Sequence, residues 1–221
     1  MDNDFYLLSA SSYCIEGICL SKKNNTLSIT RDSVGFPKLN ETDLEEERGA
    51  NSGQWIKRIG MFLDRQQWRD HAITFLLPAE DVTFRKITFP FKERKKVEQA
   101  LPFELEEELM GNLADSTYSV DVHLMSEQNS EALVLLMERE QLEQLKQLCM
   151  KRDLLIQNID CAAYALFRSK IHDNSNLLEP RDLFQIYLGG DETFVNTVRE
   201  GRLDEIKIFP NTIPEILRKH F

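Results

Sequence analysis

The sequence predicts an α/β protein in which groups of strands and amphipathic helices follow one another along the chain. Apolar runs typical of strands occur at both ends and in the middle of its 221 residues. Segments with apolar residues three and four positions apart lie between these runs and predict helices. The run from Ala132 to Met137 is apolar throughout, which favours a strand at the centre of a sheet.

The composition is typical of a globular protein and argues against nucleic-acid binding. Hydrophobic residues make up 42% of the chain and charged residues 29%, which is ordinary for a folded domain and unlike a disordered one. The chain has 27 basic and 37 acidic residues, so its formal net charge is -10. An acidic protein repels a phosphate backbone, and no basic run with interleaved aromatic residues offsets this charge.

The sequence favours a cytoplasmic protein. Its cysteines (Cys14, Cys19, Cys149 and Cys161) show no CxxC spacing, and we expect them to be reduced. No apolar run approaches the roughly 20 residues of a bilayer span. The first residues are acidic, whereas a signal peptide begins with basic ones. We therefore expect any membrane link to come from a partner or from sequence beyond Phe221.

The N-terminal third is predicted to contain three strands and one helix. The strands are residues 5–9, 14–20 and 27–30, with turn-prone Ser and Asn residues between them. The acidic stretch 40–47 is expected to be a solvated loop. A helix over 54–67 follows, because its apolar residues recur at helical spacing (Trp55, Ile59, Phe62 and Leu63).

Two strands come next, over 73–77 and 82–89. In the second strand the apolar residues change phase, because Val82 and Phe84 would face one side and Ile87 and Phe89 the other. A β-bulge near residues 85–86 would restore a single apolar face, and we expect one there.

The segment 92–109 has the apolar stripe of a helix, interrupted by Pro102. Proline removes a backbone donor and clashes with the preceding turn. Basic residues come before the proline and acidic ones after it, which opposes the dipole of one continuous helix and suits two shorter ones. We therefore predict a kink that divides the helix at Pro102.

The remaining elements are predicted from the same periodicities. Strands are expected over 118–124, 132–137, 154–159, 184–188, 193–199 and 203–209, and helices around 142–148 and over 161–171. A capping box of Thr212 and Glu215, with Pro214 just inside it, predicts a further helix. Because this helix has hardly begun at Phe221, we expect the second lobe to be truncated.

Four segments of the chain carry a family resemblance: LPAEDV at 77–82, ITFP at 87–90, ALPFELEEEL at 100–109 and LLIQNIDCAAYAL at 154–166. They resemble the cytoplasmic domain of the GspL family, the inner-membrane scaffold of bacterial type II secretion. The same segments are similar to the type IV pilus family PilM and, more distantly, to FtsA. The resemblance spans most of the chain.

This resemblance implies a degenerate actin-like ATPase fold with an inserted α/β subdomain and a truncated second lobe. The implied division is 1–72 as the first part of lobe I, 73–151 as the inserted subdomain, 152–180 as the return to lobe I, and 181–221 as the start of lobe II.

Actin-like ATPases hold metal and phosphates with two Asp-x-Gly loops, and neither loop is intact in this sequence. The first position reads Leu8 to Ser12, without Asp or Gly. At the second, Gly189, Gly190 and Thr193 match the pattern, but Tyr187 stands where the acid would be. We interpret this as a vestigial phosphate loop, or simply a Gly-Gly turn, and expect no cofactor, no metal and no catalytic residue.

Other chemistry is not expected either. The histidines (His71, His123, His172 and His220) lack metal-ligand spacing, and no nucleophile has a local catalytic signature.

The charged segment around Pro102 has three interpretations. Its basic half carries Lys92, Arg94, Lys95 and Lys96, and its acidic half carries Glu104, Glu106, Glu107 and Glu108. Such charges usually form a solvated helix face. They could also orient a protein partner, for which we select Lys92, Arg94, Lys95, Lys96, Glu104, Glu107 and Glu108, or the basic half could approach anionic lipids.

By resemblance, the expected function is a non-catalytic scaffold at the cytoplasmic face of the inner membrane. Its expected partners are a secretion ATPase of the GspE type and inner-membrane secretion or pilus proteins, and a homodimer is left open. The alternatives are a PilM-like pilus scaffold, on which a short tail of a membrane protein docks, and an active actin-like ATPase.

Overall fold

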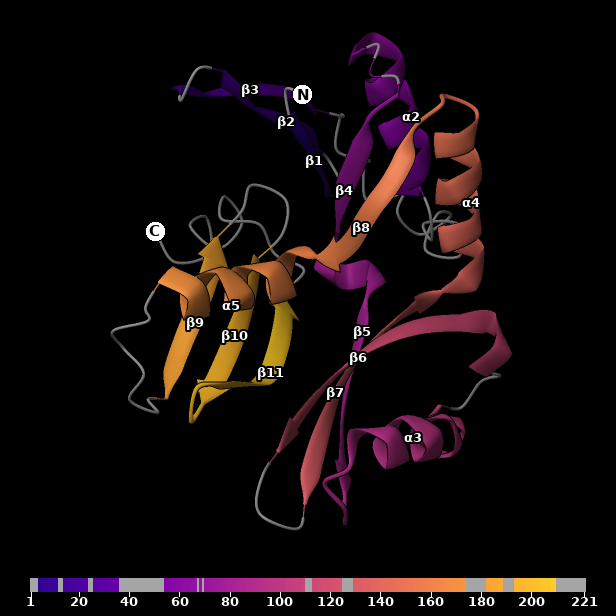
Figure 1. Cartoon of the computed structure of the whole chain (residues 1–221), viewed down its shortest axis with the longest axis vertical. Helices are drawn as coiled ribbons and strands as arrows, with labels where there is room; N and C mark the ends of the chain where they lie inside the picture. The colour runs from indigo at the N-terminus through magenta and orange to yellow at the C-terminus, as the bar shows by residue number, and fades with distance from the viewer. Residues whose placement is uncertain are drawn as a thin grey trace. The chain divides into compact units, whose positions relative to one another are not determined.

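A computed structural model describes residues 4–11, 14–23, 26–35, 54–66, 68, 70–109, 113–124, 129–173, 182–188 and 193–209 of the chain. These residues form two compact units (Figure 1). One unit combines Met1–Asp81 with Leu145–Phe221, and the other is Val82–Gln144. We describe each unit by itself.

The first unit contains a five-stranded sheet in the order β3-β2-β1-β4-β8. Its strands are β1 (Phe5–Ala10), β2 (Cys14–Lys23), β3 (Thr26–Gly35), β4 (Ala72–Leu77) and β8 (Leu155–Cys161). The first three strands pair antiparallel, whereas β4 pairs in parallel with both β1 and β8. Side chains alternate between the two faces, so that Tyr6, Leu8 and Ala10 are all buried on one face of β1.

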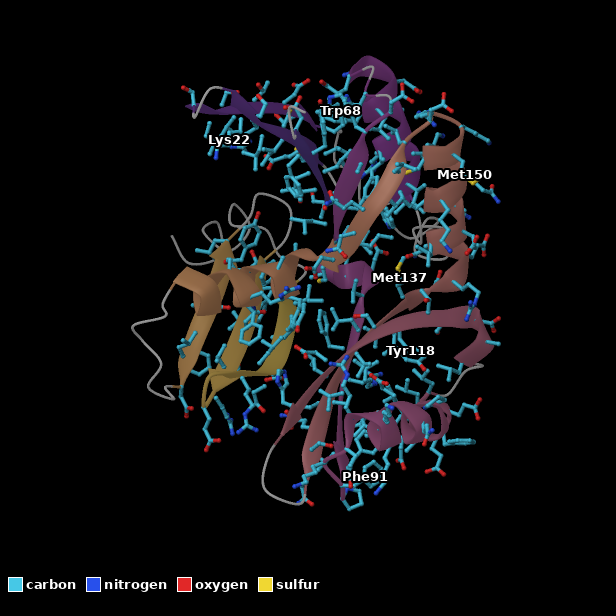
Figure 2. All side chains as sticks on the ribbon, in the orientation of Figure 1. Lys22, Trp68, Phe91, Tyr118, Met137 and Met150 are labelled. Atoms are coloured by element: carbon cyan, nitrogen blue, oxygen red, sulfur yellow. The ribbon has the colours of Figure 1, made fainter. Side chains whose placement is uncertain are left out.

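Helix α2 (Gln54–Gln66) packs on this sheet because one face of the helix is apolar. Its buried residues are Trp55, Ile56, Ile59, Phe62 and Leu63. The Phe62 ring lies against Gly17 of β2, where the absence of a side chain makes room for it. Trp68 adds edge-on ring contacts to Phe62 and Tyr6, with centroids 5.6 and 5.0 Å apart (Figure 2).

Arg152 joins α2 to the end of α4 (Arg139–Met150). Its guanidinium donates from Nε to Asp64 Oδ1 at 2.9 Å and from Nη2 to Asp64 Oδ2 at 3.0 Å. Arg152 Nη1 also donates to the Leu148 carbonyl at 3.1 Å. A guanidinium and a carboxylate matched in this way hold each other's orientation better than a single contact does.

The first unit also contains a second, three-stranded antiparallel sheet in the order β11-β10-β9. Its strands are β9 (Leu183–Leu188), β10 (Thr193–Arg199) and β11 (Arg202–Phe209). Helix α5 (Ala162–Asp173) lies over this sheet (Figure 1). The buried Asn196 ties the helix to the sheet, because its side-chain amide donates to the Ala163 carbonyl at 2.8 Å.

The two sheets of this unit share a register that the sequence does not reveal. Ala10 pairs with Ile15 in the hairpin of β1 and β2, and Leu188 pairs with Thr193 in the hairpin of β9 and β10. Leu188 lies 178 positions after Ala10, and Thr193 lies 178 positions after Ile15. The same offset relates the pair Leu8–Gly17 to the pair Ile186–Val195. Burial differs, however, because Leu8 is 0% exposed and Ile186 is 62% exposed.

The unit Val82–Gln144 is a three-stranded antiparallel sheet with one helix on it. The sheet has the order β5-β7-β6, with β5 (Thr83–Phe89), β7 (Ser130–Glu138) and β6 (Ser116–Leu124). The helix is α3 (Arg94–Glu108), and a short 3-10 turn lies at Leu113–Asp115; another, at Ala79–Asp81, belongs to the first unit. The core of this unit, between the sheet and α3, consists of Ile87, Phe89, Val97, Leu101, Leu105, Ala132, Val134 and Leu136. Phe91 packs against this core with its ring centroid 5.5 Å from that of Phe89 (Figure 2).

The predicted bulge near residues 85–86 is wrong. The pairing of β5 with β7 runs without a shift from Thr83–Leu136 to Phe89–Ser130. The apolar phase changes because Val82 is buried before the strand begins, while Phe84 lies half-buried on the face opposite Ile87.

Helix α3 runs through Pro102 as one element, so the expected division into two shorter helices is wrong. The kink at Pro102 stays a prediction. Val97, Leu101 and Leu105 form a single buried stripe at four-residue spacing, and we attribute the continuity of the helix to their packing on the sheet.

The other predicted strands and helices are present in the described residues, with boundaries that differ by a few positions. Cys161, for example, ends β8 instead of opening the next helix. The acidic stretch 40–47 and the predicted helix from Thr212 lie outside the described residues. Within the described part of the chain, no helix is long and apolar enough to cross a membrane.

Candidate functional site

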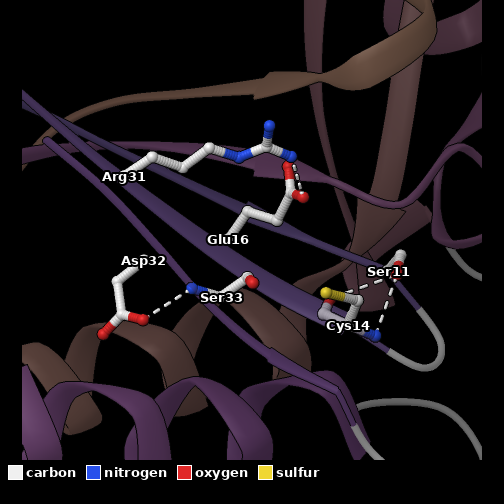
Figure 3. A network of polar contacts seen from close by, with 6 residues as sticks. All are labelled: Ser11, Cys14, Glu16, Arg31, Asp32 and Ser33. Carbon is white, nitrogen blue, oxygen red and sulfur yellow. Dashed lines mark hydrogen bonds and ion pairs between the residues drawn. The ribbon is translucent and has the colours of Figure 1, made fainter. Parts of the chain in front are cut away.

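The hairpin of β1 and β2 contains the position that corresponds, by the resemblance, to the first phosphate loop of actin-like ATPases. Ser11 follows β1, and its hydroxyl is engaged by the backbone of Cys14 (Figure 3). Ser11 Oγ donates to the Cys14 carbonyl at 3.1 Å and accepts from the Cys14 amide at 3.1 Å. The Ser11 hydroxyl is therefore engaged by the backbone of Cys14 through both of these hydrogen bonds.

The carboxylates near this hairpin are also held by protein groups. Glu16 forms an ion pair and hydrogen bond with Arg31 across β2 and β3 (Figure 3). Asp32 accepts a hydrogen bond from the Ser33 amide at 2.8 Å and another from the side chain of Gln66.

The second loop offers little to a phosphate in its described residues. Gly189 and Gly190 lie outside the described residues. Tyr187 stacks on Phe194, with centroids 4.8 Å apart and planes 18° from parallel. Thr193 is 3% exposed, so its hydroxyl is shielded from solvent. No group of three or more His, Cys, Asp or Glu side chains that could bind a metal occurs among the described residues.

The structure places the predicted partner-binding residues together on the exposed side of α3 and at its start. Two of the basic residues pair within this segment: Arg94 with Glu98 at 2.8 Å and Lys96 with Glu93 at 3.2 Å. Glu108 lies 4.0 Å from Arg85 of β5. These contacts are solvent-exposed, so each contributes little to stability.

The other charged side chains of this surface are exposed and form no ion pair within the described residues. They are Lys92, Lys95, Glu104, Glu106 and Glu107. Because their charges are not neutralised locally, they remain available to a partner of opposite charge.

Phe103 is the functional candidate that the sequence interpretation missed. It is 71% exposed, although it is a large apolar side chain in the middle of a charged helix. Successive residues of an α-helix turn by about 100°, which places Phe103 opposite the buried stripe of Val97, Leu101 and Leu105. The helical spacing of the buried residues is the signal that could have found it.

A cavity of about 370 Å³ lies beside this surface, and Glu106 and Tyr118 line it together with Arg139. Arg139 donates from Nε to the Ala114 carbonyl at 2.7 Å and from Nη2 to the Ser116 carbonyl at 2.8 Å. The guanidinium thus fixes the turn before β6 and forms one wall of the cavity.

The histidines and cysteines have structural surroundings where they are described. His71 stacks on Tyr6 with centroids 4.2 Å apart, and His123 lies 3.4 Å from Asp121. Burial raises the pKa of the Cys149 thiol to about 11, which keeps it protonated and unreactive at neutral pH. Burial, together with a hydrogen bond to Cys19, raises the pKa of Tyr6 to about 12.

Comparison with known proteins identifies the family that this chain resembles. Residues 63–169 match the family described as "Type II secretion system (T2SS), protein L". The resemblance to the GspL family is confirmed over this segment. No curated protein sequence matches the chain.

Solved structures share the fold at low sequence identity. A chain of the PilM-PilN type IV pilus biogenesis complex superposes with a TM-score of 0.71 and 13% identity, over 97% of this chain and 63% of that one. This chain thus spans less than two thirds of that structure's length. The cytoplasmic domain of EpsL, an inner-membrane component of type II secretion in Vibrio cholerae, gives a TM-score of 0.55 and 14% identity, over 94% and 71%. The predicted actin-like α/β fold is confirmed.

The described residues do not fit the magnesium and nucleotide that an actin-like ATPase fold implies. Such a site needs an acid to hold the metal and backbone amides that approach the phosphates closely. Ser11 is engaged by Cys14, and Tyr187, which the resemblance aligns with the acid, packs against Phe194. No catalytic step is therefore assigned to this site.

Proposed function

We propose that the chain is a non-catalytic scaffold of a bacterial type II secretion system. In this role it lies at the cytoplasmic face of the inner membrane and recruits a secretion ATPase of the GspE type. The observation that carries the proposal is the family match over residues 63–169, which includes the whole of the unit Val82–Gln144 and its helix α3. The division into 1–72, 73–151, 152–180 and 181–221 belongs to the same proposal.

The surface around α3 is the proposed docking surface of this scaffold. It consists of Lys92, Arg94, Lys95, Lys96, Glu104, Glu107 and Glu108, with Phe103 among them. An exposed aromatic residue surrounded by charges has the composition of a protein-interaction site, because the ring supplies contact area and the charges supply orientation.

Binding of the secretion ATPase tests the scaffold role directly. The immobilised full chain should retain the purified cognate ATPase. Phe103→Ser should reduce retention about tenfold or more, because exposed aromatic residues at interfaces often contribute most of the binding energy. Lys57→Glu in α2 is the control, since Lys57 is exposed and lies in the other unit. No retention of the ATPase by the unchanged chain would refute recruitment.

ATP turnover tests the non-catalytic part of the proposal. The purified chain should release no phosphate above background from ATP with Mg²⁺. Saturable, Mg²⁺-dependent hydrolysis that Tyr187→Ala abolishes would mean that the chain is an active actin-like ATPase.

A PilM-like scaffold of type IV pilus assembly is the second candidate. It is favoured by the higher TM-score to the PilM-PilN complex, 0.71 against 0.55 for the EpsL domain. The two candidates differ in partner, so parallel pull-downs with a secretion ATPase and with a PilN-like membrane protein distinguish them.

A further inference from the structure

The cavity beside α3 lies within the unit Val82–Gln144, and its walls come from separate elements of that unit. Glu106 belongs to α3, Tyr118 to β6 (Figure 2) and Arg139 to the first position of α4. The volume of about 370 Å³ is at the lower end of the roughly 300–1,000 Å³ that is usual for ligand sites. The size of the cavity therefore suits one small molecule.

Two side chains of opposite charge line this cavity without pairing with each other. Within the described residues, Glu106 forms no ion pair and no hydrogen bond, and Arg139 donates only to backbone carbonyls. A carboxylate and a guanidinium that share a cavity and do not neutralise each other both keep their charge for a ligand. A ligand that matches both must itself carry a positive and a negative group.

The guanidinium of Arg139 is held in place by the protein. The Ala114 carbonyl accepts from its Nε at 2.7 Å, and the Ser116 carbonyl accepts from its Nη2 at 2.8 Å. A guanidinium has five N–H groups in a planar fork, so its Nη1 and Nη2 edge keeps donors that these two bonds do not use. A carboxylate matches such an edge with two parallel hydrogen bonds. Arg139 is thus positioned as a carboxylate-binding group.

Glu106 and the apolar part of the wall define the rest of the ligand. The Glu106 carboxylate accepts hydrogen bonds only, and an ammonium group is the charged donor that fits it. Leu113, Ala114 and the ring of Tyr118, which is 37% exposed, add apolar surface. The lining therefore matches a molecule with a carboxylate, an ammonium group and a small apolar body.

We propose that this cavity binds a free α-amino acid, whose carboxylate pairs with Arg139 and whose ammonium group pairs with Glu106. In an α-amino acid both charged groups are attached to one carbon atom, so a single small molecule brings both to the cavity. The backbone of an internal peptide segment carries neither group, which favours the free molecule over a docked protein segment. The proposal does not depend on recruitment of the secretion ATPase.

NMR titration of the full chain with single amino acids tests the proposal. When each common α-amino acid is added to about 10 mM, at least one should shift the amide signals of Glu106 and of residues 113–118 saturably, with a Kd of about 1 mM or tighter. Amides of β1 and β4, in the other unit, should not shift. The N-acetyl derivative and the carboxamide of that amino acid, which each lack one charge, should bind about tenfold more weakly.

Glu106→Gln separates the contributions of the two charges. The variant keeps the size of the side chain but does not balance an ammonium group. It should bind the amino acid about tenfold or more weakly, with no change in affinity for the N-acetyl derivative. Glu140→Gln is the matched control, because this exposed residue of α4 loses the same charge next to Arg139 but is not part of the cavity wall. It should bind the amino acid like the unchanged chain.

Four results would overturn the proposal. They are no saturable shift with any amino acid, shifts only outside the cavity wall, equal affinity for the N-acetyl derivative, and unchanged amino-acid binding by Glu106→Gln.

Discussion

Asp160 shows how the environment of one carboxyl group couples protonation to stability. It is the residue before the last of β8 and is largely buried. Its carboxylate accepts a hydrogen bond from the Cys161 amide at 2.8 Å and lies 3.8 Å from Arg168. Burial raises the pKa of Asp160 above its usual 3.8, and it outweighs the opposing effects of the hydrogen bond and of Arg168. The folded state thus binds this proton more tightly than the unfolded state does.

The sign of this shift gives a prediction for Asp160→Asn. Stability that depends on the protonated form is present below the usual carboxyl range and is lost as pH rises through the raised pKa. Asn keeps the acceptor for the Cys161 amide but carries no charge. Urea unfolding should therefore show the variant gaining stability relative to the parent as pH rises from about 3 to 7. A relative gain that is largest at low pH would contradict the assignment.

Gly17 illustrates a position where even one methyl group is excluded. A Cβ atom there would lie 2.8 Å from Trp68 Cη2, 2.7 Å from Phe62 Cε1 and closer still to Phe62 Cζ. Gly17→Ala should cost about 1–3 kcal/mol of unfolding free energy, because the rings are packed and must shift. Gly35→Ala, with nothing within 4 Å of its Cβ, is the control and should change stability far less. Equal effects in thermal melts would mean that the ring packing is not the cause.

At the scale of the element, β1 and β9 pair with their neighbouring strands in the same register but differ in burial. Leu8 and Ile186 occupy equivalent positions, and α2 packs on the sheet that contains Leu8. Leu8→Ala should cost about 2–5 kcal/mol, the range for emptying a buried site. Ile186→Ala, at 62% exposure, should cost less than about 1 kcal/mol. Urea denaturation measures both, and a large loss for Ile186→Ala would show that this face is covered in solution.

The strands were the predictable elements, because a buried sheet imposes a simple period on the sequence. The run Ala132 to Met137 was correctly predicted as a central strand, since β7 lies between β5 and β6. The two candidate phosphate loops could be compared with the Asp-x-Gly pattern from the sequence alone. Ser11 lies in the first loop, which has neither Asp nor Gly, and Tyr187 stands at the position of the acid in the second. The common register of the two hairpins could not be predicted from the sequence. Leu8 and Ile186 are both apolar, but their cross-strand partners, Gly17 and Val195, have no side-chain property in common that would align the two hairpins.

Helix α3 shows why local rules failed where tertiary packing dominates. Proline at an internal position costs about 3 kcal/mol in an isolated helix, and this cost predicted a break at Pro102. Burial of Val97, Leu101 and Leu105 against the sheet is of comparable or greater magnitude, at about 1.5–3 kcal/mol for each side chain. Neither the continuity of α3 nor the exposure of Phe103 follows from propensity alone.

For the whole molecule, the decisive feature is that each unit has its own core. Every member of the cluster that includes Leu105 lies within Val82–Gln144, whereas Leu8, Phe62 and Phe75 are buried in the other unit. Because the two cores are separate, we expect each unit to keep its own packing when the core of the other is perturbed.

Hydrogen exchange on the full chain tests this independence. Leu105→Ala empties a fully buried site of the unit Val82–Gln144 and should cost that unit about 2–5 kcal/mol. Amides of β5, β6 and β7 should then exchange faster, while those of β1, β4 and β8 keep their protection. Leu8→Ala should give the reverse pattern. If either substitution accelerates exchange equally in both sets of strands, the chain unfolds as one cooperative body, and α3 cannot act as part of an independent docking unit.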